Sequence, residues 1–226
     1  MVGNAFYRGD RRTLQKLKSE IDQIELPNGE IEKLELQMKF ITAALDDDYE
    51  AINEVDKAEL KRWLFLLEHW SNGSLALLAN CMSLYTIADI RPLVQSVFRQ
   101  AGRRRTADRD RDTIIMAIAL NFAEKCIQNN NDEACAAALA IVASYPPVPQ
   151  TTFYKLVAAY YQALLDFRQS PTDEKLGTIQ TITVALNAGG LAFFADNLNN
   201  FFDTYSKNNR DSSKSLSDEN KTTLVR

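Results

Sequence analysis

The residues best suited to chemistry in this chain are three asparagines, each at the end of a run of small or apolar residues. They are Asn80 after Leu77-Leu78-Ala79, Asn121 after Ala119-Leu120, and Asn187 after Ala185-Leu186. A carboxamide both donates and accepts hydrogen bonds, and a buried one without a partner costs about 1–3 kcal/mol. Each amide therefore either bonds a neighbouring helix or loop, or faces an inner surface where it can pair with the backbone of an extended peptide.

Other side chains could assist such a peptide site. Lys61 and Arg62 precede Trp63 and could attract a carboxylate, although a solvated pair is the default interpretation. Aromatic residues in the C-terminal half could line a groove, although core packing is the commoner role for them. These aromatic residues are Tyr154, Tyr160, Tyr161, Phe167, Phe193 and Phe194. The predicted peptide-binding set is Asn80, Asn121, Asn187, Arg62 and Tyr160.

The sequence lacks the patterns that catalysis or cofactor binding would need. His69 is the only histidine, and no serine or cysteine nucleophile stands near it in an elbow context. Gly189-Gly190 is an isolated pair at a helix exit and does not form a phosphate-binding loop. The acidic stretch 46–50 lacks the central glycine and the closing glutamate of a calcium loop. We therefore expect neither an enzyme, nor a cofactor, nor a metal site.

Charge and cysteine content narrow the class of protein further. The formal net charge is -4 and the pI is about 5.2, so the chain as a whole lacks the basic footprint of an autonomous DNA-binding domain. The three cysteines (Cys81, Cys126 and Cys135) lie in apolar stretches and are expected to be buried. No segment approaches the roughly 18 apolar residues of a membrane span. We expect a soluble, cytoplasmic protein.

These candidate residues lie in a series of amphipathic segments with helical periodicity. The pattern predicts helices over 10–24, 30–45, 57–70, 74–85 and 86–102, then from the charged run at 103–112 to 128, and over 133–144, 151–167, 173–188 and 191–206. Asn72-Gly73 is predicted as a turn and Asp132 as an N-cap. Ten helices give five antiparallel pairs with a period of about 40 residues, which indicates an all-α solenoid. This domain is expected to span 1–207, followed by a disordered polar tail over 208–226.

Several of these segments resemble one known family, the C-terminal domain of the Rgg/GadR/MutR transcriptional regulators. The resemblance extends from about residue 5 to residue 207. It is carried by Tyr7, Asp10 and Leu14, by the segment from Trp63 to Trp70, by Leu78-Ala79-Asn80, and by Ile118-Ala119-Leu120-Asn121 with Cys126-Ile127.

This resemblance implies a right-handed solenoid of about five tetratricopeptide-like helix pairs. It further implies a domain that forms a homodimer and holds a short hydrophobic signalling peptide in its concave face, as in quorum sensing, and so alters transcription. DNA contact would come only through a helix-turn-helix domain, which we expect to be missing from this chain. The alternative is a helical-repeat protein–protein interaction scaffold without a small peptide ligand.

Overall fold

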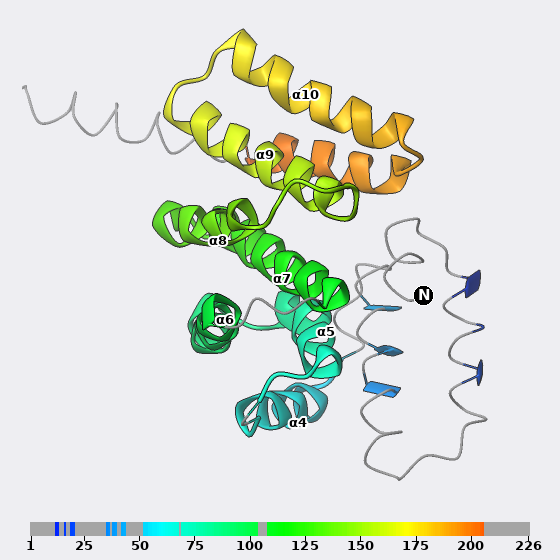
Figure 1. Ribbon diagram of the computed structural model, residues 1–226. Coiled ribbons are helices and arrows are strands. Elements are labelled where there is room, and N and C mark those ends of the chain that lie inside the picture. The colour runs from blue at the N-terminus through cyan, green and yellow to red at the C-terminus, as the bar shows by residue number, and fades with distance from the viewer. Residues whose placement is uncertain are drawn as a thin grey trace, which may run out of the picture. The chain divides into compact units, whose positions relative to one another are not determined.

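In the computed structural model the chain is all-helical wherever it forms regular structure, and no described residue lies in a β-strand (Figure 1). The structure describes residues 12, 13, 16, 19, 20, 35, 36, 38, 39, 42, 43, 52–67, 69–103 and 108–205. Most of the predicted helices over 10–24 and 30–45, the acidic stretch 46–50 and the predicted tail over 208–226 lie outside the described residues.

The described helices follow one another through short connections. They are α4 (Glu54–Phe65), α5 (Asn72–Cys81), the 3-10 turn η2 (Met82–Leu84), α6 (Ile87–Arg103), α7 (Arg109–Gln128), α8 (Asp132–Ser144), α9 (Pro149–Gln169), α10 (Asp173–Ala188) and a further helix over 192–205. The chain divides into two compact units, Met1–Ala158 and Ala159–Arg226, so that α9 begins in the first unit and ends in the second.

From α6 onward the predicted helix ranges are confirmed to within two residues, and α10 has the predicted ends. Local capping explains this agreement. The Thr172 side chain accepts from the backbone N–H of Lys175 at the start of α10, and Gly190 has a φ of 84° just beyond its end. One cap differs from the prediction, because Asn131 and not Asp132 accepts the backbone N–H of Ala134 and caps α8.

The prediction of one helix over 57–70 is wrong at its C-terminal end. Helix α4 ends at Phe65, where the backbone N–H of Leu66 donates to the Arg62 carbonyl at 3.1 Å. The predicted Asn72-Gly73 turn is also wrong, because both residues lie in the first turn of α5. Ser71 caps that helix in a reciprocal capping box with Ser74, and this box starts α5 before the predicted turn.

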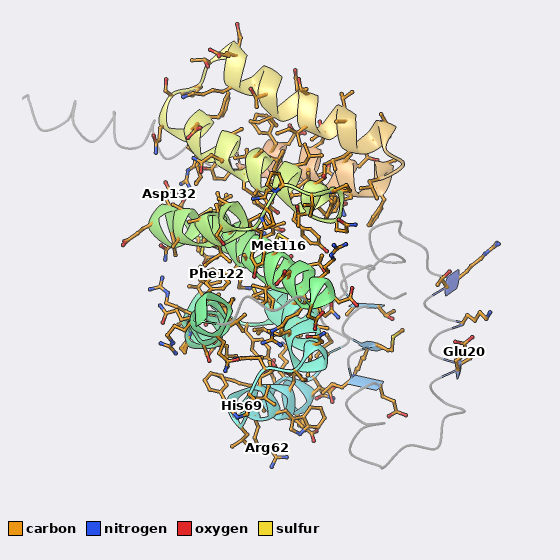
Figure 2. All side chains as sticks on the ribbon, in the orientation of Figure 1. Glu20, Arg62, His69, Met116, Phe122 and Asp132 are labelled. Atoms are coloured by element: carbon orange, nitrogen blue, oxygen red, sulfur yellow. The ribbon has the colours of Figure 1, made fainter. Side chains whose placement is uncertain are left out.

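Helix α7 is at the centre of the first unit and packs against α5, α6 and α8. Its Met116 and Phe122, labelled in Figure 2, are both buried. The expectation that the three cysteines are buried is confirmed: Cys81 on α5, Cys126 on α7 and Cys135 on α8 are all buried. Burial raises the pKa of the Cys126 thiol to about 11, against a smaller opposing effect of the Arg91 charge.

The second unit is held together by aromatic side chains of α9 and of the helix over 192–205. Tyr160 is completely buried, and its hydroxyl donates to the Leu198 carbonyl at 2.5 Å. Tyr161 meets Phe201 edge to face with 6.0 Å between ring centroids. Edge-to-face contacts of this kind stabilise a core beyond the area that they bury. None of the described helices is both long enough and apolar enough to cross a membrane.

Candidate functional site

The most specific polar arrangement in the first unit is a row of three side chains on α7 that donate to main-chain carbonyls between residues 70 and 83. Arg111 Nη1 reaches the Trp70 carbonyl at 2.8 Å, Asn121 Nδ2 the Ala79 carbonyl at 2.9 Å, and Lys125 Nζ the Ser83 carbonyl at 2.9 Å. The three contacts join residues 41, 42 and 42 positions apart, in the same order along both segments. Helices α5 and α7 therefore run in the same direction with a nearly constant offset.

The positions of these contacts follow from helix geometry. Asn121 and Lys125 are four residues apart, so their side chains lie on the same face of α7. The carbonyls that they contact lie in the last turn of α5 and in η2, where a helix has acceptors without intrahelical partners. Burial lowers the pKa of Lys125, and the nearby Glu124 carboxylate partly opposes this effect. Side chains of α7 thus cap the C-terminal end of α5 from outside.

One of the predicted asparagines, Asn121, makes a contact at this junction, next in sequence to a second one, Asn80. Asn121 bonds the carbonyl of Ala79, which directly precedes Asn80. The Asn80 side chain is half-buried and has no hydrogen bond to any residue in the described part of the chain. Asn121 follows the structural alternative that the sequence left open, since its amide bonds a neighbouring helix. The Asn80 carboxamide carries both donors and an acceptor, so it can donate to and accept from a peptide backbone.

None of the three asparagines is buried, and Asn80 is intermediate. Asn121 and Asn187 are exposed, and the buried polar residues of the described part are Thr151 and Thr183. Apolar residues occur on the sides of α7 that pack against other helices, and Asn121 lies on the remaining side although apolar residues precede it in the sequence.

The other predicted binding residues are Arg62 on α4 and two residues of the second unit, Tyr160 and Asn187. Arg62, labelled in Figure 2, is exposed and points away from α5 and α7. Its neighbour Lys61 forms an ion pair with Asp89 at 2.6 Å, and its charge is therefore not available to a peptide carboxylate. Tyr160 is completely buried in the second unit, and its hydroxyl donates to the Leu198 carbonyl. The prediction that Tyr160 lines a groove is therefore wrong, and the alternative that it packs in the core is confirmed. Asn187 lies exposed in the last turn of α10, also in the second unit.

Trp70 and Arg111 are structural residues of this junction that the sequence did not identify. The indole N–H of Trp70 donates to Ser96 Oγ on α6 at 3.2 Å, while its carbonyl accepts from Arg111 on α7. Arg111 belongs to the charged run at 103–112, where we expected a helix to begin. The available signal was its position fourteen residues before Lys125, which places both side chains within about 40° of each other around a regular helix.

Comparison with known proteins adds a family and a fold. The family model described as "HTH-type transcriptional regulator Rgg, C-terminal domain" matches residues 14–209. A solved structure described as "Crystal structure of a putative transcriptional regulator from Listeria monocytogenes EGD-e" is similar, with a TM-score of 0.69 and 14% sequence identity. The similarity covers 92% of this chain and 72% of that chain, and at this identity it concerns the fold alone. No curated protein sequence matches the chain.

Proposed function

This chain belongs to the family of C-terminal domains of HTH-type transcriptional regulators of the Rgg type, and from that premise we propose that it is a peptide-sensing and dimerisation domain. It acts in the cytoplasm and binds a short hydrophobic signalling peptide. Contact with DNA is made by the helix-turn-helix part of such a regulator. The observation that carries this proposal is the Asn80 carboxamide, which has no hydrogen bond in the described part of the chain and follows the Ala79 carbonyl that Asn121 contacts.

The helix arrangement supports a repeat architecture with an inner surface. Helices α5 and α7 run in the same direction about 42 residues apart. Burial raises the pKa of Tyr154 on α9, and the nearby Thr113 of α7 partly opposes this effect, so the same spacing of 41 residues recurs at a third helix. Every second helix is thus a neighbour one period further along the chain, as in stacked helix pairs. We propose that the complete domain is a solenoid of about five tetratricopeptide-like pairs.

The chemistry of the α5–α7 junction suits a peptide whose side chains are apolar. Asn80 has unused donors and an unused acceptor, and an extended peptide backbone offers both kinds of group. Main-chain pairing gives affinity that does not depend on the peptide's side chains. Lys125 adds a single positive charge one turn beyond Asn121, which suits a peptide carboxylate.

Titration calorimetry with short apolar peptides from the culture medium of the host tests the proposal. Asn80→Ala should weaken binding without loss of stability, because the Asn80 side chain makes no bond in the folded chain. Asn121→Ala should weaken binding and also remove the contact with Ala79. Gln95→Ala, which removes an exposed amide from α6, is the matched control and should bind normally. Absence of heat with every peptide, together with capture of a protein partner, would favour the scaffold alternative.

We propose that the chain self-associates through its C-terminal helices. Val184 on α10 is 66% exposed, and Phe193 on the helix over 192–205 is also exposed. Large apolar side chains on the surface of neighbouring helices are typical of a protein–protein contact when they form a patch. Val184→Lys should weaken this association in sedimentation velocity, whereas Gln180→Lys, an exposed change on the same helix, should not.

A further inference from the structure

Helix α4 exposes an apolar face that no described element covers. Val55 is 73% exposed, Phe65 48% and Leu66 72%. Ala58 and Arg62 are exposed between them. Isolated apolar residues on a surface are normal, but three large ones along one short helix and its cap are not.

These five residues form one continuous stripe. At about 100° per residue they fall within an arc of about 100° on the helix surface, on the side opposite to the buried Leu60 and Leu64. The ion pair of Lys39 with Asp56 lies on a third side of α4, away from the stripe. The stripe therefore has the geometry of a surface onto which another helix packs.

The spacing of the stripe is that of a coiled-coil seam. Val55, Ala58, Arg62 and Phe65 are separated by three, four and three residues, which is the a/d pattern of a heptad. A single charged residue in such a seam costs stability but fixes the register and the partner. Arg62 occupies that position here, and the acidic Glu59 flanks it. Neither residue has an ion pair within the described part of the chain.

We propose that this stripe docks onto the same stripe of a second copy of the chain, with the two α4 helices antiparallel. A two-fold axis between residues 60 and 61 places Val55 opposite Leu66 of the second copy and Glu59 opposite Arg62 of the second copy. Each of these two contacts then occurs twice. The contact of Val55 with Leu66 is apolar, the contact of Glu59 with Arg62 joins opposite charges, and both are favourable. Lys61 stays outside because it is paired with Asp89.

The size of the helix sets the strength of this contact. Twelve residues of α4 span about 18 Å, and a pair of such helices buries less than the roughly 1,200–2,000 Å² of a standard stable interface. The contact is therefore weak between free chains and becomes effective when another interface raises the local concentration. The inference goes beyond the proposed function, because it needs no peptide and uses residues of the first unit, whereas Val184 belongs to the second unit.

Charge reversal tests the proposal. Sedimentation equilibrium over a wide concentration range compares the wild-type chain with Glu59→Arg and Arg62→Glu. In a dimer of either single variant, residues 59 and 62 of opposite copies carry like charges at both contacts. The affinity between copies should therefore fall by about ten-fold or more. An equimolar mixture of the two variants restores both opposite-charge contacts and should regain the association. Circular dichroism establishes that each variant is folded.

Two controls separate this contact from other effects. Arg99→Glu makes the same charge change at an exposed position of α6 and should leave the association unchanged. The variant Val184→Lys should retain the concentration-dependent association that depends on Glu59 and Arg62, even if it weakens association through the C-terminal helices. A wild-type chain without a concentration-dependent step, single variants that associate like the wild type, or a mixture that does not recover would each overturn the proposal.

Discussion

Replacing Trp70 by alanine should be among the most damaging single changes in the first unit. The Trp70 side chain is 6% exposed, and its indole N–H bonds Ser96 on α6. Truncation of a buried aromatic residue to alanine costs about 3–5 kcal/mol. Loss of the donor leaves the Ser96 hydroxyl with one bond fewer, which adds about 1 kcal/mol. We expect a loss of about 4 kcal/mol or more in the free energy of unfolding.

Trp63 provides a matched control within the same segment. Both tryptophans belong to the run from Trp63 to Trp70, but Trp63 is only half-buried on α4. Trp63→Ala should therefore cost about 1–2 kcal/mol, in proportion to the smaller apolar area that it removes from water. Trp70→Phe keeps most of the packing and removes the donor, so it should fall between the two.

Urea unfolding followed by circular dichroism measures all three variants. The midpoint should fall most for Trp70→Ala while the slope of the free energy against urea stays near the wild-type value, which indicates that the folded state is otherwise intact. Equal losses for Trp70→Ala and Trp63→Ala would refute the reasoning, because burial would then not decide the cost. A Trp70→Phe variant as unstable as Trp70→Ala would show that the bond to Ser96 outweighs the packing.

The pH dependence of stability offers a second prediction. Hydrogen bonds from Lys61 and Thr86 hold the pKa of Asp89 below its usual range, so Asp89 stabilises the folded state above the unfolded pKa of about 3.9 and loses this effect as pH falls through the folded pKa. The difference in urea midpoint between wild type and Asp89→Asn should therefore be largest near neutral pH and shrink in acid; a constant difference down to about pH 2 would contradict this. A third prediction concerns two glycines of the second unit. Gly177→Ala, inside α10 with nothing within 4 Å of the added Cβ, should raise stability by about 0.5–1 kcal/mol, whereas Gly190→Ala, at a φ of 84°, should lower it by about 1 kcal/mol. Thermal unfolding checks both signs, and two shifts in the same direction would be inconsistent with the backbone argument.

The predicted peptide site remains a prediction, and the structure places its residues on separate elements. A nearly constant offset of 42 residues brings Asn121 on α7 to the Ala79 carbonyl at the end of α5, next to Asn80 in the sequence. Helical periodicity alone does not separate a completely buried tyrosine such as Tyr160 from one that lines a groove, because both positions favour an aromatic side chain. The outward direction of Arg62 likewise depends on which side of α4 its neighbours occupy, and that side is fixed only when the helices pack.

The sequence by itself determined the elements that short-range forces govern, together with the family. Apolar periodicity indicated the helices from α6 onward, and Gly189-Gly190 marked the end of α10, because these signals act within a few residues. Only the tertiary structure decided where α4 ends, because the apolar pattern continues unbroken from Trp63 to Trp70. The break is fixed by contacts with residues far along the chain: Ser96 holds the Trp70 indole and Arg111 holds its carbonyl. Contacts over such separations are set by packing, which a one-dimensional pattern does not contain.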